Sequence, residues 1–213
     1  MQLISVNIGE KRAISTKSGS TGIYKQPANG PVEIGPLGIS TDVIVDVEHH
    51  GGLDQAIYIY GTPDYEWWSK ELRQDLGPGT FGENLTISGL ESAGCLIGDI
   101  FKIGTVTLEV TYPRIPCVTL AARMGDPEFV KRYRHAERPG VYCRMVQPGV
   151  LQAGDAVEYI PYAGETISAL EMFRDFYAGP KDEAKLRRYL AAPLTSSARQ
   201  EYEEQLQKLL ESR

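Results

Sequence analysis

Short apolar runs, separated by glycine, proline and asparagine, fill the chain up to about residue 162. In Val106–Val110 apolar residues alternate with polar ones, which is typical of a strand with one face in solvent. Strands do not alternate regularly with long helices, so the pattern favours a mainly β fold with some α, a barrel or sandwich. The predicted strands are Leu3–Ile8, Ala13–Lys17, Val32–Ile34, Val43–Val47, Ala56–Tyr60, Leu85–Ile87, Ile100–Ile103, Val106–Val110, Val141–Val146 and Ala156–Tyr159.

Helices are predicted at a few places within this region and throughout the end of the chain. Thr62-Pro63-Asp64 supplies a cap, a proline at the first helical position and an acid at the positive end of a helix. Further short helices are predicted over Val118–Met124 and after Asp126-Pro127, and three segments follow at roughly 166–178, 181–191 and 196–211. We therefore predict a β-barrel domain over residues 1–162 and a three-helix appendage over 163–213, which packs on the barrel or on a second subunit in a homodimer.

Composition narrows the environment and the partners. A chain of 213 residues can form a core without disulfides. It has three cysteines, an odd number, and its first residues lack the basic and then apolar segments of a secretory leader. We therefore expect the protein in the reducing cytoplasm. No apolar stretch approaches the ~18 residues that cross a bilayer. A net charge of −6 disfavours binding to nucleic acid or to an anionic membrane. Small molecules are the better candidate ligands.

One cysteine stands in a stiff loop. In Tyr112-Pro113-Arg114-Ile115-Pro116-Cys117 the two prolines fix the backbone on either side of an arginine, directly before a predicted helix. A thiol at a helix N-terminus with a nearby guanidinium loses its proton easily, and the thiolate attacks electrophiles or binds soft metals. The alternative is a small buried side chain in a proline-rich turn.

A second segment, His50-Gly51-Gly52-Leu53-Asp54, lets the backbone approach a ligand closely, and its successive N–H groups suit an anion. The alternative is a glycine-rich turn before a buried strand, with His50 in a structural role. A zinc site is disfavoured, because no histidine or cysteine partner lies at ligand spacing.

Two further segments offer polar groups. Phe81-Gly82-Glu83-Asn84-Leu85 predicts a turn in which Asn84 tolerates left-handed geometry and presents an amide that can both donate and accept. The stretch from Lys131 to Arg144 is the most basic of the chain, and Arg138 and Arg144 are candidate cations for a phosphate. The alternative for this stretch is a solvated helix face followed by a strand.

In order and spacing, His50-Gly51-Gly52-x-Asp54, Phe81-Gly82-Glu83-Asn84-Leu85, Gly98-Asp99 and Pro113-Arg114-x-Pro116-Cys117 together resemble the MOSC domain family, named for the C-terminal domain of molybdenum cofactor sulfurase. The likeness covers about residues 1–160, and the helical tail is similar to that of the family's stand-alone, YiiM-like hydroxylaminopurine-resistance branch. It implies a barrel related to the pyruvate kinase barrel domain.

The resemblance also implies a molybdenum cofactor, a molybdopterin, with Cys117 as the protein's sulfur ligand to molybdenum. His50, Asn84 and Arg114 fall on motif positions expected to line the same pocket. The implied activity is a two-electron reduction of N-hydroxylated small molecules such as 6-hydroxylaminopurine, with His50 relaying a proton and electrons from a separate reductase. This chain departs from the family pattern at Gln55, where Lys or Arg is usual, and at Val141, where an aromatic is common.

Two other functions stay open at this point. One is a cofactor carrier or sulfur-handling module that binds the pterin without turning over a substrate. The other is a metal-independent thiol enzyme that uses Cys117 with His50.

Overall fold

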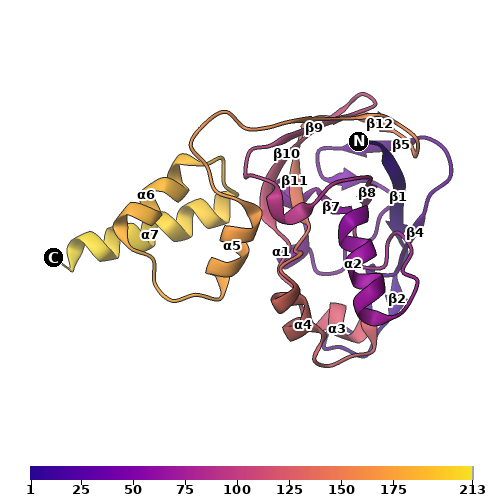
Figure 1. The fold of residues 1–213 in the computed structure, drawn as a ribbon, viewed down its shortest axis with the longest axis horizontal. Helices are drawn as coiled ribbons and strands as arrows, with labels where there is room; N and C mark the ends of the chain where they lie inside the picture. The colour runs from indigo at the N-terminus through magenta and orange to yellow at the C-terminus, as the bar shows by residue number, and fades with distance from the viewer. Residues whose placement is uncertain (213) are drawn as a thin grey trace.

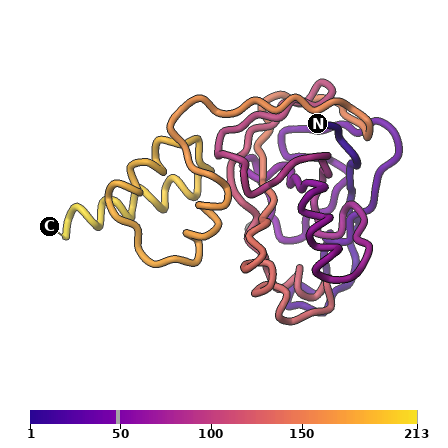
Figure 2. The backbone as a smooth tube through the Cα atoms, viewed as in Figure 1, coloured from indigo at the N-terminus to yellow at the C-terminus, as the bar shows by residue number. Residues whose placement is uncertain are grey.

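A computed structural model describes residues 1–212, together with the side chains of all of these except residues 48 and 49. A β-rich body contains the N-terminus, and a helical tail projects from one side of it and ends at the C-terminus (Figure 1). Figure 2 shows that the chain leaves the body for the tail only once.

The body is built on one curved sheet of eight strands, in the order β13-β9-β10-β11-β7-β8-β1-β4. Neighbouring strands are antiparallel except β7 and β8, which run parallel. The strands of this sheet are β1 (Leu3–Gly9), β4 (Lys25–Pro27), β7 (Ile57–Gly61), β8 (Leu85–Ile87), β9 (Ile100–Ile103), β10 (Val106–Pro113), β11 (Val141–Gln147) and β13 (Val157–Ile160). Two small sheets accompany it, made of β12 (Gly149–Leu151), β5 (Val32–Gly35) and β6 (Gly38–Ile39), and of β2 (Arg12–Ala13) and β3 (Ser20–Thr21).

The sheet curls without closing into a regular barrel. The start of β1 meets the start of β13 through an isolated bridge between Gln2 and Ala156, and the Leu3 N–H donates to the Asp155 carbonyl at 2.9 Å. No ladder of paired strands joins these two edges within the described part of the chain. The predicted fold class is therefore confirmed as mainly β with α, and the closed barrel is replaced by an open, curled sheet.

Helices lie over the body and form the tail. In the body they are α1 (Val47–His50), α2 (Thr62–Leu72), α3 (Val118–Met124) and α4 (Phe129–Ala136), with short 3₁₀ turns at η1 (Leu53–Gln55) and η2 (Ser92–Gly94). The tail consists of α5 (Ala169–Phe176), α6 (Glu183–Ala191) and α7 (Ser196–Glu211), one helix in each predicted segment. No helix among the described residues has both the length and the apolar character needed to span a bilayer.

Two hydrophobic clusters hold these elements together. The first fills the sheet and extends into the tail, where Leu186, Tyr189 and Tyr202 belong to it. The second is aromatic and lies between the sheet and helices α2 to α4; its fully buried members include Trp68, Phe81 and Tyr133. Because the first cluster joins tail and body, the tail packs on this chain itself. The division between residues 162 and 163, and a homodimer, stay predictions.

Most predicted strands are present, and two are wrong. Val43–Val47 is irregular up to α1, because its backbone packs closely against the backbone of two glycines. The Val43 N–H donates to the Gly9 carbonyl at 3.0 Å, and a Cβ on Gly22 would lie 1.7 Å from the Val43 oxygen. Of Ala13–Lys17 only the first residue is in a strand, because the rest forms a turn closed by the bond from Ile14 N to the Gly19 carbonyl.

Candidate functional site

A cavity opens at the end of the body where irregular segments meet. Its volume is about 730 Å³, including the part open to solvent. The wall comes from the β3–β4 region, the irregular segment 42–46, the end of α1, strands β7 and β11, the loop before β8 and the loop that leads into α3. The polar side chains of this wall that concern the chemistry are Lys25, Asp42, His50, Gln55, Tyr58, Asn84, Arg114, Cys117, Thr119 and Tyr142.

Cys117 lies where the sequence predicts it, at the N-cap of α3. Its carbonyl accepts from the Leu120 N–H at 3.0 Å, which starts the helix, and its side chain is half-buried in the cavity wall. Burial raises the pKa of the thiol, but a hydrogen bond from His50, the charge of Arg114 and the Leu120 N–H outweigh it and lower the pKa to about 6. At neutral pH this sulfur is therefore mostly thiolate, a nucleophile and a soft ligand.

His50 is the last residue of α1 and lies within hydrogen-bond reach of the Cys117 thiol in the cavity wall. Its Nδ1 lies 3.3 Å from the hydroxyl of Tyr142, a residue of β11. The imidazole thus contacts both a thiol and a phenol. Such a position suits proton transfer at the cavity wall.

Arg114 is a buried cation without a carboxylate partner among the described ion pairs. The residue is 4% exposed, and its guanidinium lies 5.6 Å from the ring centre of Tyr58 and 5.8 Å from that of Tyr133. Its Nη1 has no hydrogen-bond partner within the described structure. A buried N–H of this kind is costly unless a ligand accepts from it, so Arg114 marks the place where the cavity favours an anion.

Asn84 lines the cavity and also builds it. Its Oδ1 accepts from the Tyr58 N–H at 3.1 Å, and its Nδ2 donates to Asp42 at 2.8 Å. These bonds tie β7 to the irregular segment at residue 42. The positive φ of this turn, 79°, falls on Gly82 and not on Asn84.

Lys25 and Asp42 belong to the cavity wall although the sequence did not single them out as site residues. They form an ion pair whose side chains are 6% and 4% exposed. Burial lowers the pKa of Lys25, and the charge of Asp42 opposes that shift. Lys25 stands between Tyr24 and Gln26 without a motif, so nothing local in the sequence indicates its position.

Four other predicted site residues do not line the cavity. Gly51 and Gly52 lie beside it in the turn into η1, where Gly52 has a φ of 91°. Arg138 donates to buried Asp64 at 2.8 Å. Arg144 donates to the carbonyls of residues 193 and 194 in the tail.

Comparison with known proteins gives a consistent result. The family model for the MOSC domain matches residues 46–158. An uncharacterized protein of Bacillus subtilis, YflK, is 31% identical over 211 residues, covering 98% of this chain and 96% of that protein. A protein of Gibberella moniliformis named "Reductase" is 35% identical over 167 residues, which are 71% of this chain and only 29% of that protein. The crystal structure of YiiM from Geobacillus stearothermophilus superposes with a TM-score of 0.79 and 27% identity, covering 96% of this chain and 98% of that one.

Proposed function

The chain belongs to the MOSC domain family and has the fold of its YiiM-like members, and from this we propose a function. The proposed function is a molybdenum-cofactor-dependent reductase of N-hydroxylated compounds such as 6-hydroxylaminopurine. MOSC domains are associated with the molybdenum cofactor. The name of the Gibberella relative supports a reductase, although this chain matches less than a third of that protein.

The observation that carries the proposal is the half-buried Cys117 thiol with a pKa lowered to about 6 in the wall of an open cavity. A thiolate at neutral pH is a fitting ligand for a soft metal. Within the described side chains no three His, Cys, Asp or Glu residues are grouped to hold a bare metal ion. A single protein thiolate fits a metal that arrives with ligands of its own, as in a molybdopterin.

Arg114 is the residue best suited to the anionic part of that cofactor. Its buried, unpaired Nη1 is a donor without an acceptor, and phosphate oxygens are strong acceptors for guanidinium. Arg138 and Arg144 are engaged with Asp64 and with the tail, so we leave them out of the proposed cofactor site. Gly51 and Gly52 are left out as well, and Lys25 joins the site as a second buried cation of the wall.

The proposed reaction converts R–NHOH, two electrons and two protons into R–NH₂ and water. When bound, the cofactor would supply the two electrons that reduce the N–O bond. Cys117 would hold the metal at the cavity wall, and the His50 imidazole would deliver a proton to the departing oxygen, oriented by its contact with the Tyr142 hydroxyl. The partner that delivers electrons, and a cytoplasmic location, stay predictions.

The test measures molybdenum content and the reduction of 6-hydroxylaminopurine by an artificial electron donor, in the wild type and in Cys117→Ala. Cys95→Ala is the matched control, because Cys95 is also a free cysteine but is buried in the core. We expect Cys117→Ala to lose molybdenum and activity and Cys95→Ala to keep both.

Three results would contradict the proposal in distinguishable ways. Equal molybdenum content in the wild type and in Cys117→Ala would show that Cys117 is not the ligand to the metal. Molybdenum bound through Cys117 without reduction of the substrate would indicate the carrier or sulfur-handling module. Turnover by metal-free protein that depends on Cys117 would indicate the thiol enzyme.

A further inference from the structure

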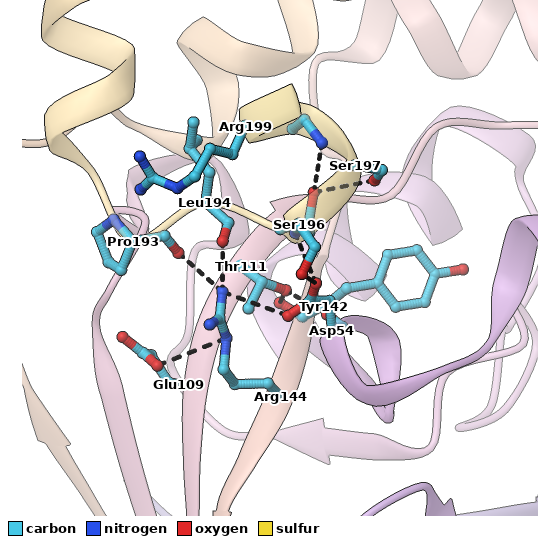
Figure 3. A network of polar contacts seen from close by, with 12 residues as sticks. Asp54, Glu109, Thr111, Tyr142, Arg144, Pro193, Leu194, Ser196, Ser197 and Arg199 are labelled. Carbon is cyan, nitrogen blue, oxygen red and sulfur yellow. Dashed lines mark hydrogen bonds and ion pairs between the residues drawn. The ribbon is translucent and has the colours of Figure 1, made fainter. Parts of the chain in front are cut away.

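A network of polar contacts, which we call the clasp, fastens the tail to the turn that follows His50. Asp54, in η1, accepts from both the N–H and the hydroxyl of Ser196, at 2.7 and 2.9 Å. Arg144 donates to the carbonyls of Pro193 and Leu194 at 3.0 and 2.6 Å and lies 3.4 Å from Asp54. Figure 3 shows Asp54 with Ser196 on one side and Arg144 on the other.

The clasp satisfies helix ends that the tail alone would leave open. Ser196 is the first residue of α7, so its N–H has no acceptor within the helix, and an acid at this end also interacts favourably with the helix dipole. The carbonyls of residues 193 and 194 follow the end of α6, where Arg144 supplies donors. Asp54 therefore acts as a cap at the start of α7, and Arg144 supplies donors to two carbonyls in the connection between α6 and α7.

The same contacts lead to the cavity along two short paths. Along the chain, Asp54 is joined to His50 by the turn in which Gln55 N donates to the Gly52 carbonyl at 3.1 Å. Through space, the Thr111 hydroxyl lies within hydrogen-bond distance of the carbonyls of Asp54, at 2.6 Å, and of Tyr142, at 3.1 Å. The Tyr142 hydroxyl in turn lies 3.3 Å from His50 Nδ1.

We propose that the clasp positions His50 in the cavity, so that the C-terminal tail is a positioning element of the site and not only an appended domain. Asp54, Arg144 and Ser196 are then positioning residues that act through His50 and touch neither substrate nor cofactor. The inference rests on the proposed function for the role of His50, but the placement of the imidazole can be measured without any turnover.

Ser196→Pro cuts the clasp at one point. Proline is favoured at the first position of a helix, and Thr195 before it is already extended, with φ −61° and ψ 152°, so α7 can still form. The substitution removes both donors to Asp54. Ser196→Ala is the conservative variant, since it keeps the N–H donor. Arg199→Ala is the matched tail control, because among the described contacts the Arg199 side chain bonds within the tail, to the carbonyls of Leu190 and Ala192 at the end of α6.

The readouts are hydrogen–deuterium exchange of a peptide covering residues 50–56 and the side-chain NMR signal of His50, which is one of three histidines. The loss of bonds to a charged group predicts about tenfold faster exchange in Ser196→Pro, with a shifted or doubled His50 signal and an unchanged His135 signal. Ser196→Ala is expected to lie close to the wild type, and Arg199→Ala to leave both readouts unchanged. Asp54→Asn keeps an acceptor but loses the charge, so both readouts are expected to lie between those of the wild type and those of Ser196→Pro.

An unchanged His50 signal in folded Ser196→Pro and Asp54→Asn would overturn the inference and leave the clasp a docking contact only. Equal changes in Arg199→Ala would overturn it too, because general loosening of the tail would then explain the effect. If the cofactor-loaded protein is active, kcat is expected to fall in Ser196→Pro with little change in KM. An inactive protein with a shifted His50 signal would contradict the proposed function and support the clasp.

Discussion

Two arginines, Arg114 in the cavity and Arg144 in the clasp, differ in the acceptors that surround them. Arg114 at the end of β10 is 4% exposed, has no carboxylate partner among the described ion pairs and keeps an unpaired Nη1. Arg144 on β11 donates to two carbonyls and is paired with Asp54 and Glu109, at 3.4 and 3.6 Å. Its Nε also has no hydrogen-bond partner within the described structure, but that nitrogen lies in the ion pair with Glu109.

The difference shows how a cation's role depends on its acceptors. All of Arg144's acceptors belong to the protein, so its charge stabilises the docked tail. Arg114 lies against the faces of Tyr58 and Tyr133, which favour a cation, and its Nη1 stays without an acceptor and is available to a ligand. The sequence made Arg114 a residue expected to line the cofactor pocket and Arg144 a candidate cation for a phosphate, and their surroundings in the structure separate the two roles.

The largest effect on stability is expected at the clasp. Arg144→Met leaves Asp54 and Glu109 without their cation, and it leaves the carbonyls of residues 193 and 194 without a donor. We therefore expect the free energy of unfolding to fall by about 2–3 kcal/mol. The measurement is reversible unfolding in urea. Arg174→Met is the control, because the Arg174–Glu137 pair lies on the surface, with side chains 57% and 37% exposed, and its loss is expected to change little. A variant at residue 144 as stable as the wild type would show that the clasp does not stabilise the fold.

Arg114→Met is expected to show the reverse pattern. Arg114 has no carboxylate partner among the described ion pairs that its loss would leave uncompensated, so the free energy of unfolding of the cofactor-free protein should change by less than about 1 kcal/mol. Binding of the cofactor should weaken about tenfold or more, because a charge-assisted hydrogen bond is lost. Bound pterin is measured by its fluorescence after release and oxidation, with Arg134→Met, an exposed position with the same change of charge, as control. Strong destabilisation without loss of pterin would place Arg114 with Arg144 as a structural cation.

Local patterns predicted much of the fold. The apolar runs at β1, β7, β10 and β11 and a helix that starts at Thr62-Pro63 were identified from the sequence alone. The predicted cap at Thr62 is wrong, because Gly61 holds the N-cap position without a side-chain cap and Thr62 is the first helical residue. Val43–Val47 failed, because its β-branched residues suit a strand while close approach to Gly9 and Gly22 leaves it no regular partner.

From the residues alone the site was predictable where one segment carries the arrangement, and the family resemblance added His50 and Asn84, which also line the cavity. Cys117 and Arg114 share a single proline-fixed loop, and that loop delivers both to the cavity. Lys25 and Asp42 come together across residues distant in sequence, and Arg144 is drawn to the tail by carbonyls about fifty residues away. Such contacts depend on the tertiary fold, which composition and spacing do not specify.

The smallest expected effect concerns His50, which lies between the two regions and contacts both Cys117 and Tyr142. Alkylation of the cofactor-free protein by iodoacetamide should report Cys117 alone, because Cys95 and Cys143 are 1% and 0% exposed. Only the thiolate reacts, so the rate should fall as the pH drops through the pKa of Cys117, with its half-maximum near the value of about 6.

In His50→Gln the hydrogen bond and positive charge of the imidazole are lost, while burial still opposes ionisation, so the pKa of Cys117 should rise and the half-maximum should move to higher pH. If the pKa approaches about 8, near the ordinary range for a thiol, the rate at neutral pH falls about tenfold. His135→Gln, at an exposed histidine, is the control and should leave the profile unchanged. A half-maximum that stays near pH 6 without His50 would assign the thiolate to Arg114 and the helix N-terminus alone, and would remove His50 from the cavity's electrostatics.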